Sequence, residues 1–148
     1  MYAAKGMSVS ELLLCLIHRT GVFGPYKKAL AHLNYQEHGK AYEIWLGLAK
    51  EGSAQAQYDL GVMLHNGLGM DKNPIRSIYW FEKAAAQHHA DAENYLGAIY
   101  KTGNGAPQDI EKALHFLKRA MEHGNNAAQR NYSELLSEGL PEKFDKAL

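Results

Sequence analysis

The sequence of 148 residues lacks several features that mark whole classes of protein. It contains a single cysteine, Cys15, so it cannot form an intramolecular disulfide bond. This excludes the small secreted scaffolds that depend on disulfides. Sixteen basic residues balance sixteen acidic ones, so the chain has no excess charge with which to hold a polyanion. We therefore expect no nucleic-acid partner.

Long apolar segments are also lacking. The longest apolar run, at 12–17, is far shorter than the roughly 20 residues of a membrane-spanning helix, so we expect no membrane span. A leader peptide is disfavoured because the acidic Glu11 adjoins this run. Bulky Leu14 also stands before Cys15, where a lipoprotein signal has a small residue. We expect a cytoplasmic protein, with a periplasmic or secreted one as the alternative.

The strongest pattern in the sequence is an internal repeat with a period of 36 residues. Small and apolar residues of one segment recur in the next at this spacing: Ala54, Ala56, Leu60, Gly61, Gly67, Gly69 and Ala84 correspond to Ala90, Ala92, Leu96, Gly97, Gly103, Gly105 and Ala120. Weaker matches extend the array to before residue 40 and beyond Gly124. A period of about 20 to 50 residues is typical of solenoids, in which each unit packs only on its neighbours.

Each repeat unit is expected to fold as a helical hairpin. The first helix carries an apolar stripe at i, i+4 and i+8: Ala56, Leu60 and Leu64. Ser53 precedes this stripe as a helix N-cap, and a glycine-containing turn follows it. The second helix begins with Asn73 as its cap and Pro74 at its first position, where the missing N–H costs nothing.

The recurring Ala-x-Ala, Leu-Gly, Gly-x-Gly and Lys-Ala-Ala elements, the last at 83–85, resemble the Sel-1-like repeat, a relative of the tetratricopeptide repeat. The resemblance covers roughly residues 35–140. It implies an all-α fold, a right-handed α-solenoid of helix-turn-helix units. It also implies a non-enzymatic adaptor or scaffold for protein partners, a role that family members have in bacterial and eukaryotic assemblies, with no cofactor.

The repeat register predicts how a single domain, 1–148, is organised. An amphipathic capping helix and turn, outside the repeat, occupy 1–24, and an incomplete opening repeat occupies 25–52. Complete repeats follow over 53–88 and 89–124. A partial repeat over 125–148 ends the array, and its last stacking face is expected to be uncovered.

The likeness to tetratricopeptide repeats indicates which side chains line a concave groove formed by the first helices. The predicted partner-binding residues are Gln55, Tyr58, Asp59, Val62, His65, Asn66, Asp91, Asn94, Tyr95, Lys101, Arg130, Asn131 and Glu134. The two tyrosines, Asn94 and Arg130 are the strongest candidates, because such side chains bind at low entropic cost or in several geometries. The expected ligand is a peptide or another protein.

Two other functions stay open. The chain could be a structural subunit that self-assembles as a homo-oligomer through its N-terminal helix or its C-terminal face. Hydrolysis of β-lactams or cell-wall material has been attributed to cysteine-rich family members, but those carry paired cysteines in each repeat. We expect no catalytic or metal site: Cys15 has only His18 as a local base, and the histidines offer only adjacent His88 and His89 and scattered singles rather than helical ligand spacing.

Overall fold

The structure, a computed structural model, describes residues 24–34 and 37–138, which form seven helices and no strand. The helices are α2 (Gly24–Asn34), α3 (His38–Lys50), α4 (Ala54–Asn66), α5 (Pro74–Ala85), α6 (Ala90–Thr102), α7 (Ile110–Glu122) and α8 (Asn126–Ser137). The predicted all-α repeat fold is confirmed. The expected capping helix and the end of the last partial repeat fall within 1–23 and 139–148, outside the described residues. None of the described helices is long and apolar enough to cross a membrane.

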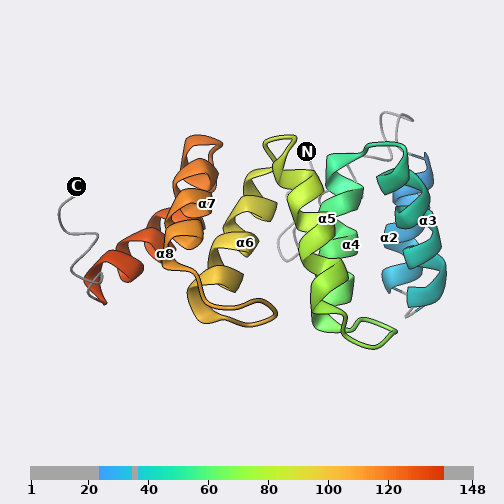
Figure 1. Cartoon of the computed structure of the whole chain (residues 1–148). Helices are drawn as coiled ribbons and strands as arrows, with labels where there is room; N and C mark the ends of the chain where they lie inside the picture. The colour runs from blue at the N-terminus through green and yellow to red at the C-terminus, as the bar shows by residue number, and fades with distance from the viewer. Residues whose placement is uncertain (1–23, 35–36, 139–148) are drawn as a thin grey trace, which may run out of the picture.

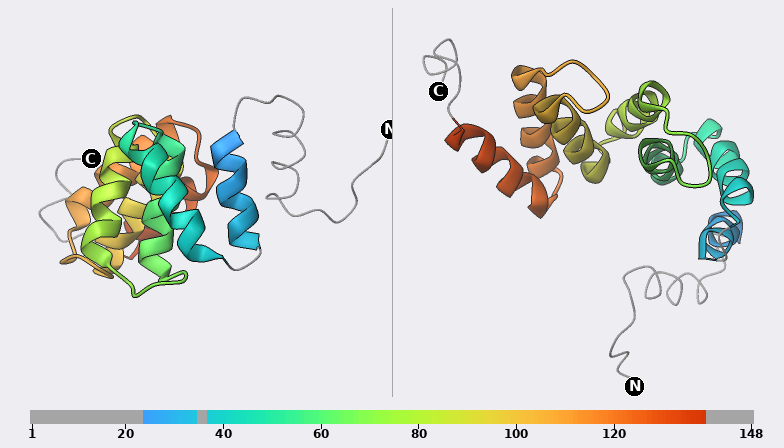
Figure 2. Two further views of the ribbon diagram at one scale, coloured as in Figure 1. Left: turned by 90° about the vertical axis from the view of Figure 1, so that its right-hand side faces the viewer. Right: turned by 90° about the horizontal axis from the view of Figure 1, so that it is seen from below.

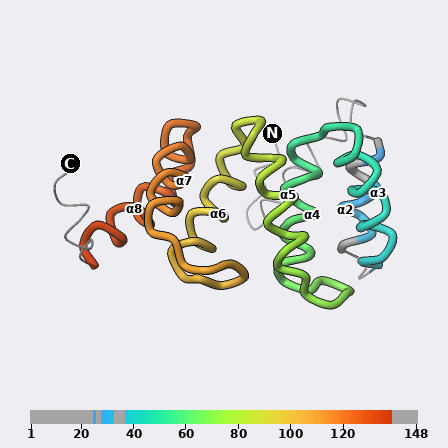
Figure 3. The backbone as a smooth tube through the Cα atoms, viewed as in Figure 1, coloured from blue at the N-terminus to red at the C-terminus, as the bar shows by residue number. Residues whose placement is uncertain are grey.

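The helices follow one another in pairs across the molecule (Figure 1), and together they form an arc (Figure 2, right). Helix α2 packs on α3, α4 on α5, and α6 on α7, while α8 packs against α7 and α6. The chain reverses direction at each connection, as the backbone trace shows (Figure 3). Seen from below, α4 and α6 lie towards the inner side of this arc and α5 towards its outer side (Figure 2, right). The first helices of successive units thus form the concave side of the molecule.

Short polar side chains begin the helices at the predicted positions. Ser53 Oγ accepts a hydrogen bond from the Ala56 N–H at 3.3 Å, and Asn73 caps α5 directly before Pro74. Each cap satisfies an N–H group that the first turn of a helix leaves without a partner. Helix α4 ends at Gly67, whose φ of +69° lies in the left-handed region that glycine adopts without strain.

The core consists of two adjoining hydrophobic clusters that meet at α5. One cluster lies among α2 to α5 and includes Trp45, Leu60 and Trp80. The other lies among α5 to α8 and includes Phe81 and Leu96. Because the consecutive residues Trp80 and Phe81 enter different clusters, α5 joins the two halves of the array.

Two repeat glycines, Gly61 and Gly97, allow the helices of one unit to approach closely. A Cβ atom on Gly61 would lie 2.7 Å from ring carbons of Phe81, and one on Gly97 would lie 2.6 Å from Cγ of Leu117. Real Cβ contacts essentially never fall below 3.0 Å. A larger residue at either glycine would therefore push the second helix of its unit away from the first.

Candidate functional site

The predicted partner-binding residues lie on the three helices of the concave side. Those on α4 are Gln55, Tyr58, Asp59, Val62, His65 and Asn66. Those on α6 are Asp91, Asn94, Tyr95 and Lys101, and those on α8 are Arg130, Asn131 and Glu134. The structure brings most of them together in two groups, a polar one between α6 and α8 and an aromatic one between α4 and α6.

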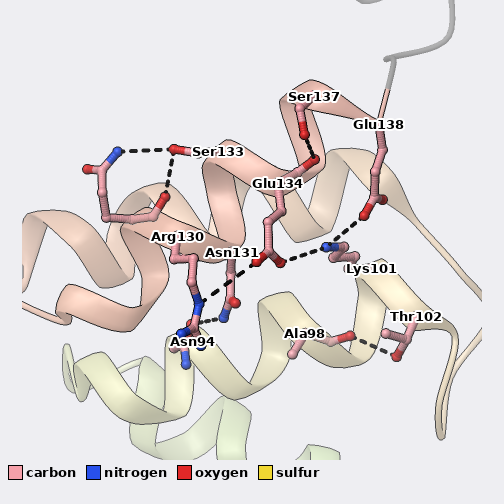
Figure 4. Close-up of polar contacts among 11 residues, drawn as sticks. Asn94, Ala98, Lys101, Thr102, Arg130, Asn131, Ser133, Glu134, Ser137 and Glu138 are labelled. Atoms are coloured by element: carbon pink, nitrogen blue, oxygen red, sulfur yellow. Dashed lines mark hydrogen bonds and ion pairs between the residues drawn. The ribbon is translucent and has the colours of Figure 1, made fainter.

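The polar group connects α6 to α8 through side chains alone (Figure 4). Asn131 Nδ2 donates a hydrogen bond to Asn94 Oδ1 at 2.8 Å. One turn or more away, Lys101 Nζ lies 3.4 Å from a carboxylate oxygen of Glu134 and 3.2 Å from one of Glu138. Glu138, which the sequence analysis did not include, follows the last residue of α8. An amide pair and a lysine between two carboxylates therefore join the last two units.

Arg130 completes this surface from α8. Its Nε atom lies 3.9 Å from Glu134 Oε1, and its side chain is 76% exposed, whereas that of Lys101 is 18% exposed. Exposed ion pairs contribute only about 0.2–1 kcal/mol each, so Arg130 can exchange Glu134 for another partner at small cost. We call the surface formed by Asn94, Lys101, Arg130, Asn131 and Glu134 the α6–α8 face.

The aromatic group fills the junction between α4, α5 and α6. Tyr58 stacks on His89 with ring centroids 4.8 Å apart and meets the edge of Tyr95 at 5.8 Å. Tyr95 in turn stacks on the buried Phe81 at 5.0 Å and meets His65 edge-on at 6.1 Å. Both tyrosines are half-buried. Burial is the main cause that raises the pKa of Tyr58 above its ordinary value of 10. These rings hold two units together, a role that the sequence analysis did not foresee.

Other predicted residues make contacts that recur at the repeat period. Gln55 Oε1 accepts a hydrogen bond from His89 Nε2 at 3.1 Å, and Asp91 Oδ1 accepts one from Asn125 Nδ2 at 2.6 Å. Asp91 and Asn125 follow Gln55 and His89 by 36 residues, so this is one contact made twice. Asn66, by contrast, turns back to its own helix and donates to a carbonyl one turn earlier. Gln55 and Asp91 therefore link neighbouring units.

Glu93 is a buried charged group that was not predicted from the sequence. The side chain of Glu93, on α6, is 0% exposed. Its Oε2 atom lies 2.7 Å from His123 Nδ1, and its Oε1 atom lies 2.8 Å from Arg119 Nη2 in an ion pair without hydrogen-bond alignment. Buried charges need such partners because desolvation otherwise outweighs any gain from burial. Both partners come from the last turn of α7 or its cap.

The preceding unit holds an uncharged version of this cluster. Gln57, 36 residues before Glu93, accepts a hydrogen bond from Gln87 at 2.9 Å and donates one to the Ala49 carbonyl at 3.0 Å. A carboxylate cannot donate, so in the next unit Arg119 makes the equivalent bond, to the Ala85 carbonyl at 2.9 Å. The change from glutamine to glutamate at equivalent positions was visible in the sequence, but its burial was not.

Among the described residues, one group of side chains has the composition of a metal site. His88, Glu93 and His123 each offer a ligand atom, and these atoms lie within 4.8 Å of one another. The sequence analysis, which considered ligand spacing along a helix, did not predict this group because its members come from three separate segments. Cys15 and His18 lie outside the described residues.

Comparison with known proteins identifies the repeat. The family model described as Sel1 repeat matches residues 54–89 and 90–125. Chitin synthase regulatory factor 3 of Schizosaccharomyces pombe is 33% identical over 104 residues, which cover 68% of this chain and 11% of that protein. The ERAD-associated E3 ubiquitin-protein ligase component HRD3B of Arabidopsis thaliana is 22% identical over 129 residues, 76% of this chain and 21% of that protein. This chain therefore matches only a small part of each relative.

A solved structure with the same architecture is that of c5321, a protective antigen present in uropathogenic Escherichia coli strains and described as displaying an SLR fold. It superposes with a TM-score of 0.74 and 26% sequence identity, over 90% of this chain and 30% of that one. The helical pairs described above are thus an arrangement that occurs in longer arrays.

Proposed function

Because this chain belongs to the Sel1-repeat family, we propose that it is a non-enzymatic adaptor that binds a protein or peptide partner on the concave side of its arc of helices. The observation that carries the proposal is the α6–α8 face, where amide and charged side chains of two units gather on one surface. Two relatives are named as a chitin synthase regulatory factor and as a component of a ubiquitin ligase, and these names, which describe regulation and assembly, support this class of role.

The chemistry of the α6–α8 face favours an extended peptide segment as the partner. The hydrogen bond between Asn131 and Asn94 uses one donor of the former and the acceptor of the latter. Each side chain amide has two N–H donors and one carbonyl acceptor, so an N–H of Asn94 and the carbonyl of Asn131 can pair with a peptide backbone. Each backbone residue in turn presents one donor and one acceptor. Arg130 would then select an acidic side chain of the partner.

Tyr58 and Tyr95 are still proposed to contact the partner, but they also pack between two units. Their rings are half-buried in the α4–α6 junction, where each contacts several other rings. Replacing either would disturb the angle between two units as well as any direct contact. The decisive test therefore uses the α6–α8 face, whose side chains do not support the hydrophobic core.

The test begins with capture of partners from the source cell, followed by isothermal titration calorimetry with the purified partner. Asn131→Ala and Arg130→Ala are each expected to weaken binding at least about tenfold, since interface anchors of this kind contribute more than about 1.4 kcal/mol. Lys118→Ala, an exposed position on the outer helix α7, is the matched control and should leave the affinity within a few fold. Loss of binding in the control alone would refute the proposed surface.

The alternative of self-assembly has its own measurement. Light scattering across a range of protein concentrations would show a rise in mass if a second copy were the partner. The adaptor proposal expects a constant mass without the partner. We place the protein in the cytoplasm as part of this proposal, since a single cysteine gives no sign of an oxidising compartment.

A further inference from the structure

Three side chains from separate segments converge where the unit at 53–88 meets the unit at 89–124. His88 lies in the turn between α5 and α6, Glu93 lies in the first turn of α6, and His123 follows the last residue of α7. One ligand atom of each lies within 4.8 Å of the others, and the two imidazole centroids are 4.7 Å apart. Glu93 is buried, whereas both histidines are exposed. The group thus has a carboxylate at its base and open access from solvent.

We infer that His88, Glu93 and His123 form a binding site for a transition-metal ion such as Zn²⁺. Two imidazoles and one carboxylate are a ligand set that zinc accepts, with water in the fourth position. Imidazole also suits Ni²⁺, Cu²⁺ and Co²⁺, whereas Mg²⁺ and Ca²⁺ prefer oxygen ligands alone. The site would therefore discriminate against the two abundant alkaline-earth cations.

The ligand side chains must move to hold the ion, and His88 must move furthest. His123 Nδ1 and Glu93 Oε2 are 2.7 Å apart. Two ligands of a tetrahedral zinc ion lie about 3.3 Å apart, given metal–ligand bonds of about 2.0–2.1 Å. The pair must therefore open by only about half an ångström. The His88 ring must turn so that its ligand atom, now within 4.8 Å of the other two, approaches them to about 3.3 Å.

Arg119 is compatible with an ion at this position because it engages the other carboxylate oxygen. Its Nη2 atom lies 2.8 Å from Oε1 of Glu93 and donates to the Ala85 carbonyl at 2.9 Å. Both contacts can persist when Oε2 binds a metal. Arg119 would then orient the ligating carboxylate, as outer partners of metal ligands commonly do.

The repeat itself indicates that the fold does not require these three side chains. The positions 36 residues earlier hold Gly52, Gln57 and Gln87. The turn position is left-handed in the three units where it is described, with φ of +99° at Gly52, +62° at His88 and +92° at Gly124. Among the described residues, His88 is the one non-glycine with a positive φ. These three substitutions relative to the preceding unit thus lie together in one cluster, and one of them places a histidine in a strained backbone conformation.

A bound ion would connect α6 to the segments on both sides of it. It would hold the turn that leads out of α5, the start of α6 and the end of α7 at fixed separations. That junction sets the angle between two units and hence the curvature of the concave side. The inference stands independently of the proposed adaptor function, because it rests on side chains outside the α6–α8 face.

The test is a titration of the full chain, free of any polyhistidine tag and stripped of metal, with Zn²⁺ in a calorimeter. Binding of one Zn²⁺ per chain is expected, with Co²⁺ giving the visible absorption of a four-coordinate site. Three variants place the preceding unit's residue at each ligand position: His88→Gly, Glu93→Gln and His123→Gln. Each is expected to weaken Zn²⁺ binding at least tenfold while keeping the helical circular dichroism spectrum. His88→Gly in particular relieves backbone strain, so it should fold.

His89→Asn is the matched control, because it removes the neighbouring histidine that does not belong to the cluster. Asn125 occupies the equivalent position 36 residues later and caps α8 with its side chain, so asparagine suits this place. The control is expected to bind Zn²⁺ as the original chain does. Absence of Zn²⁺ binding by the original chain would overturn the inference. Binding that His88→Gly and His123→Gln leave unchanged would overturn it as well.

Discussion

Arg119 and Glu93 form an ion pair at 2.8 Å in which the carboxylate is completely buried and the guanidinium is partly exposed. The same Arg119 nitrogen donates to the carbonyl of Ala85, at the end of the preceding unit's second helix. One side chain therefore neutralises a buried charge and satisfies a helix-terminal carbonyl. Arg119 thus makes an electrostatic contact within its own unit and a backbone contact with the preceding unit.

Replacing Arg119 should be costly because it would leave Glu93 buried with only His123 beside it. Breaking a buried pair by removing one partner typically costs about 3–5 kcal/mol, and the partial exposure of Arg119 puts the expected loss near the lower end. Urea denaturation of Arg119→Ala followed by circular dichroism measures this loss.

A double-mutant cycle with Glu93→Gln separates the charge effect from lost packing. In the Glu93→Gln background no buried charge remains, so Arg119→Ala should cost much less than it does alone. Equal costs in both backgrounds would show that Arg119 acts through packing and the Ala85 bond alone.

The close approach of helices within a unit predicts a second effect on stability. Gly61→Ala and Gly97→Ala would place a Cβ atom within 2.7 Å of Phe81 and Leu117, and such overpacking typically costs about 1–3 kcal/mol. Thermal denaturation should show a lower melting temperature for both variants.

Gly47→Ala is the matched control for this prediction. Gly47 lies inside α3, and a Cβ atom there would have nothing within 4 Å. Alanine has a higher helix propensity than glycine by about 1 kcal/mol, so this variant should melt at a higher temperature. Shifts of the same sign at Gly47 and Gly61 would contradict the packing argument.

Local features of the fold could be predicted from the sequence because their causes lie within a few residues. The caps at Ser53 and Asn73 and the left-handed turn at Gly67 depend on residue types and spacings that a single unit contains. The repeat of 36 residues then indicated that Gly61 and Gly97 occupy equivalent positions in two units. None of these predictions depends on the angle at which two units pack.

The features that sequence reasoning missed all depend on contacts across about one repeat. Tyr95 meets Tyr58 and Phe81 only once two units have docked, and Glu93 meets its two partners only when α7 has folded back on α6. The period identifies which positions are equivalent, but not which of them the docking angle buries. Partner binding by the predicted residues stays a prediction.

The burial of Tyr58 should make the stability of the protein depend on pH in the alkaline range. Its pKa is raised above the ordinary value of 10, so the folded state favours the neutral phenol. The unfolded chain ionises first as the pH rises past 10, and the contribution of Tyr58 to stability, complete at lower pH, is then lost progressively. Tyr58→Phe cannot ionise, so its free energy of unfolding should fall less between neutral and alkaline pH than that of the original chain. Urea denaturation at both pH values measures the difference, and an identical fall in both proteins would show that Tyr58 ionises as freely when folded as when unfolded.

The lysine between two carboxylates should govern how firmly the last helix is held. Lys101 is largely covered and contacts both Glu134 and Glu138, whereas ordinary surface pairs join two exposed groups. Its removal should therefore cost near the upper limit for such pairs, about 1 kcal/mol. Because α8, among the described helices, packs mainly against α6 and α7, the cost should appear as local opening of α8 rather than as global unfolding. Hydrogen exchange of Lys101→Ala should show faster exchange, by about fivefold, for the amides of α8 and unchanged exchange in α4.

Lys118→Ala, which removes an exposed lysine from the outer side of α7, is the control and should leave hydrogen exchange in both helices unchanged. Equal acceleration in α4 and α8 would indicate that the whole array, and not its last unit, depends on this contact.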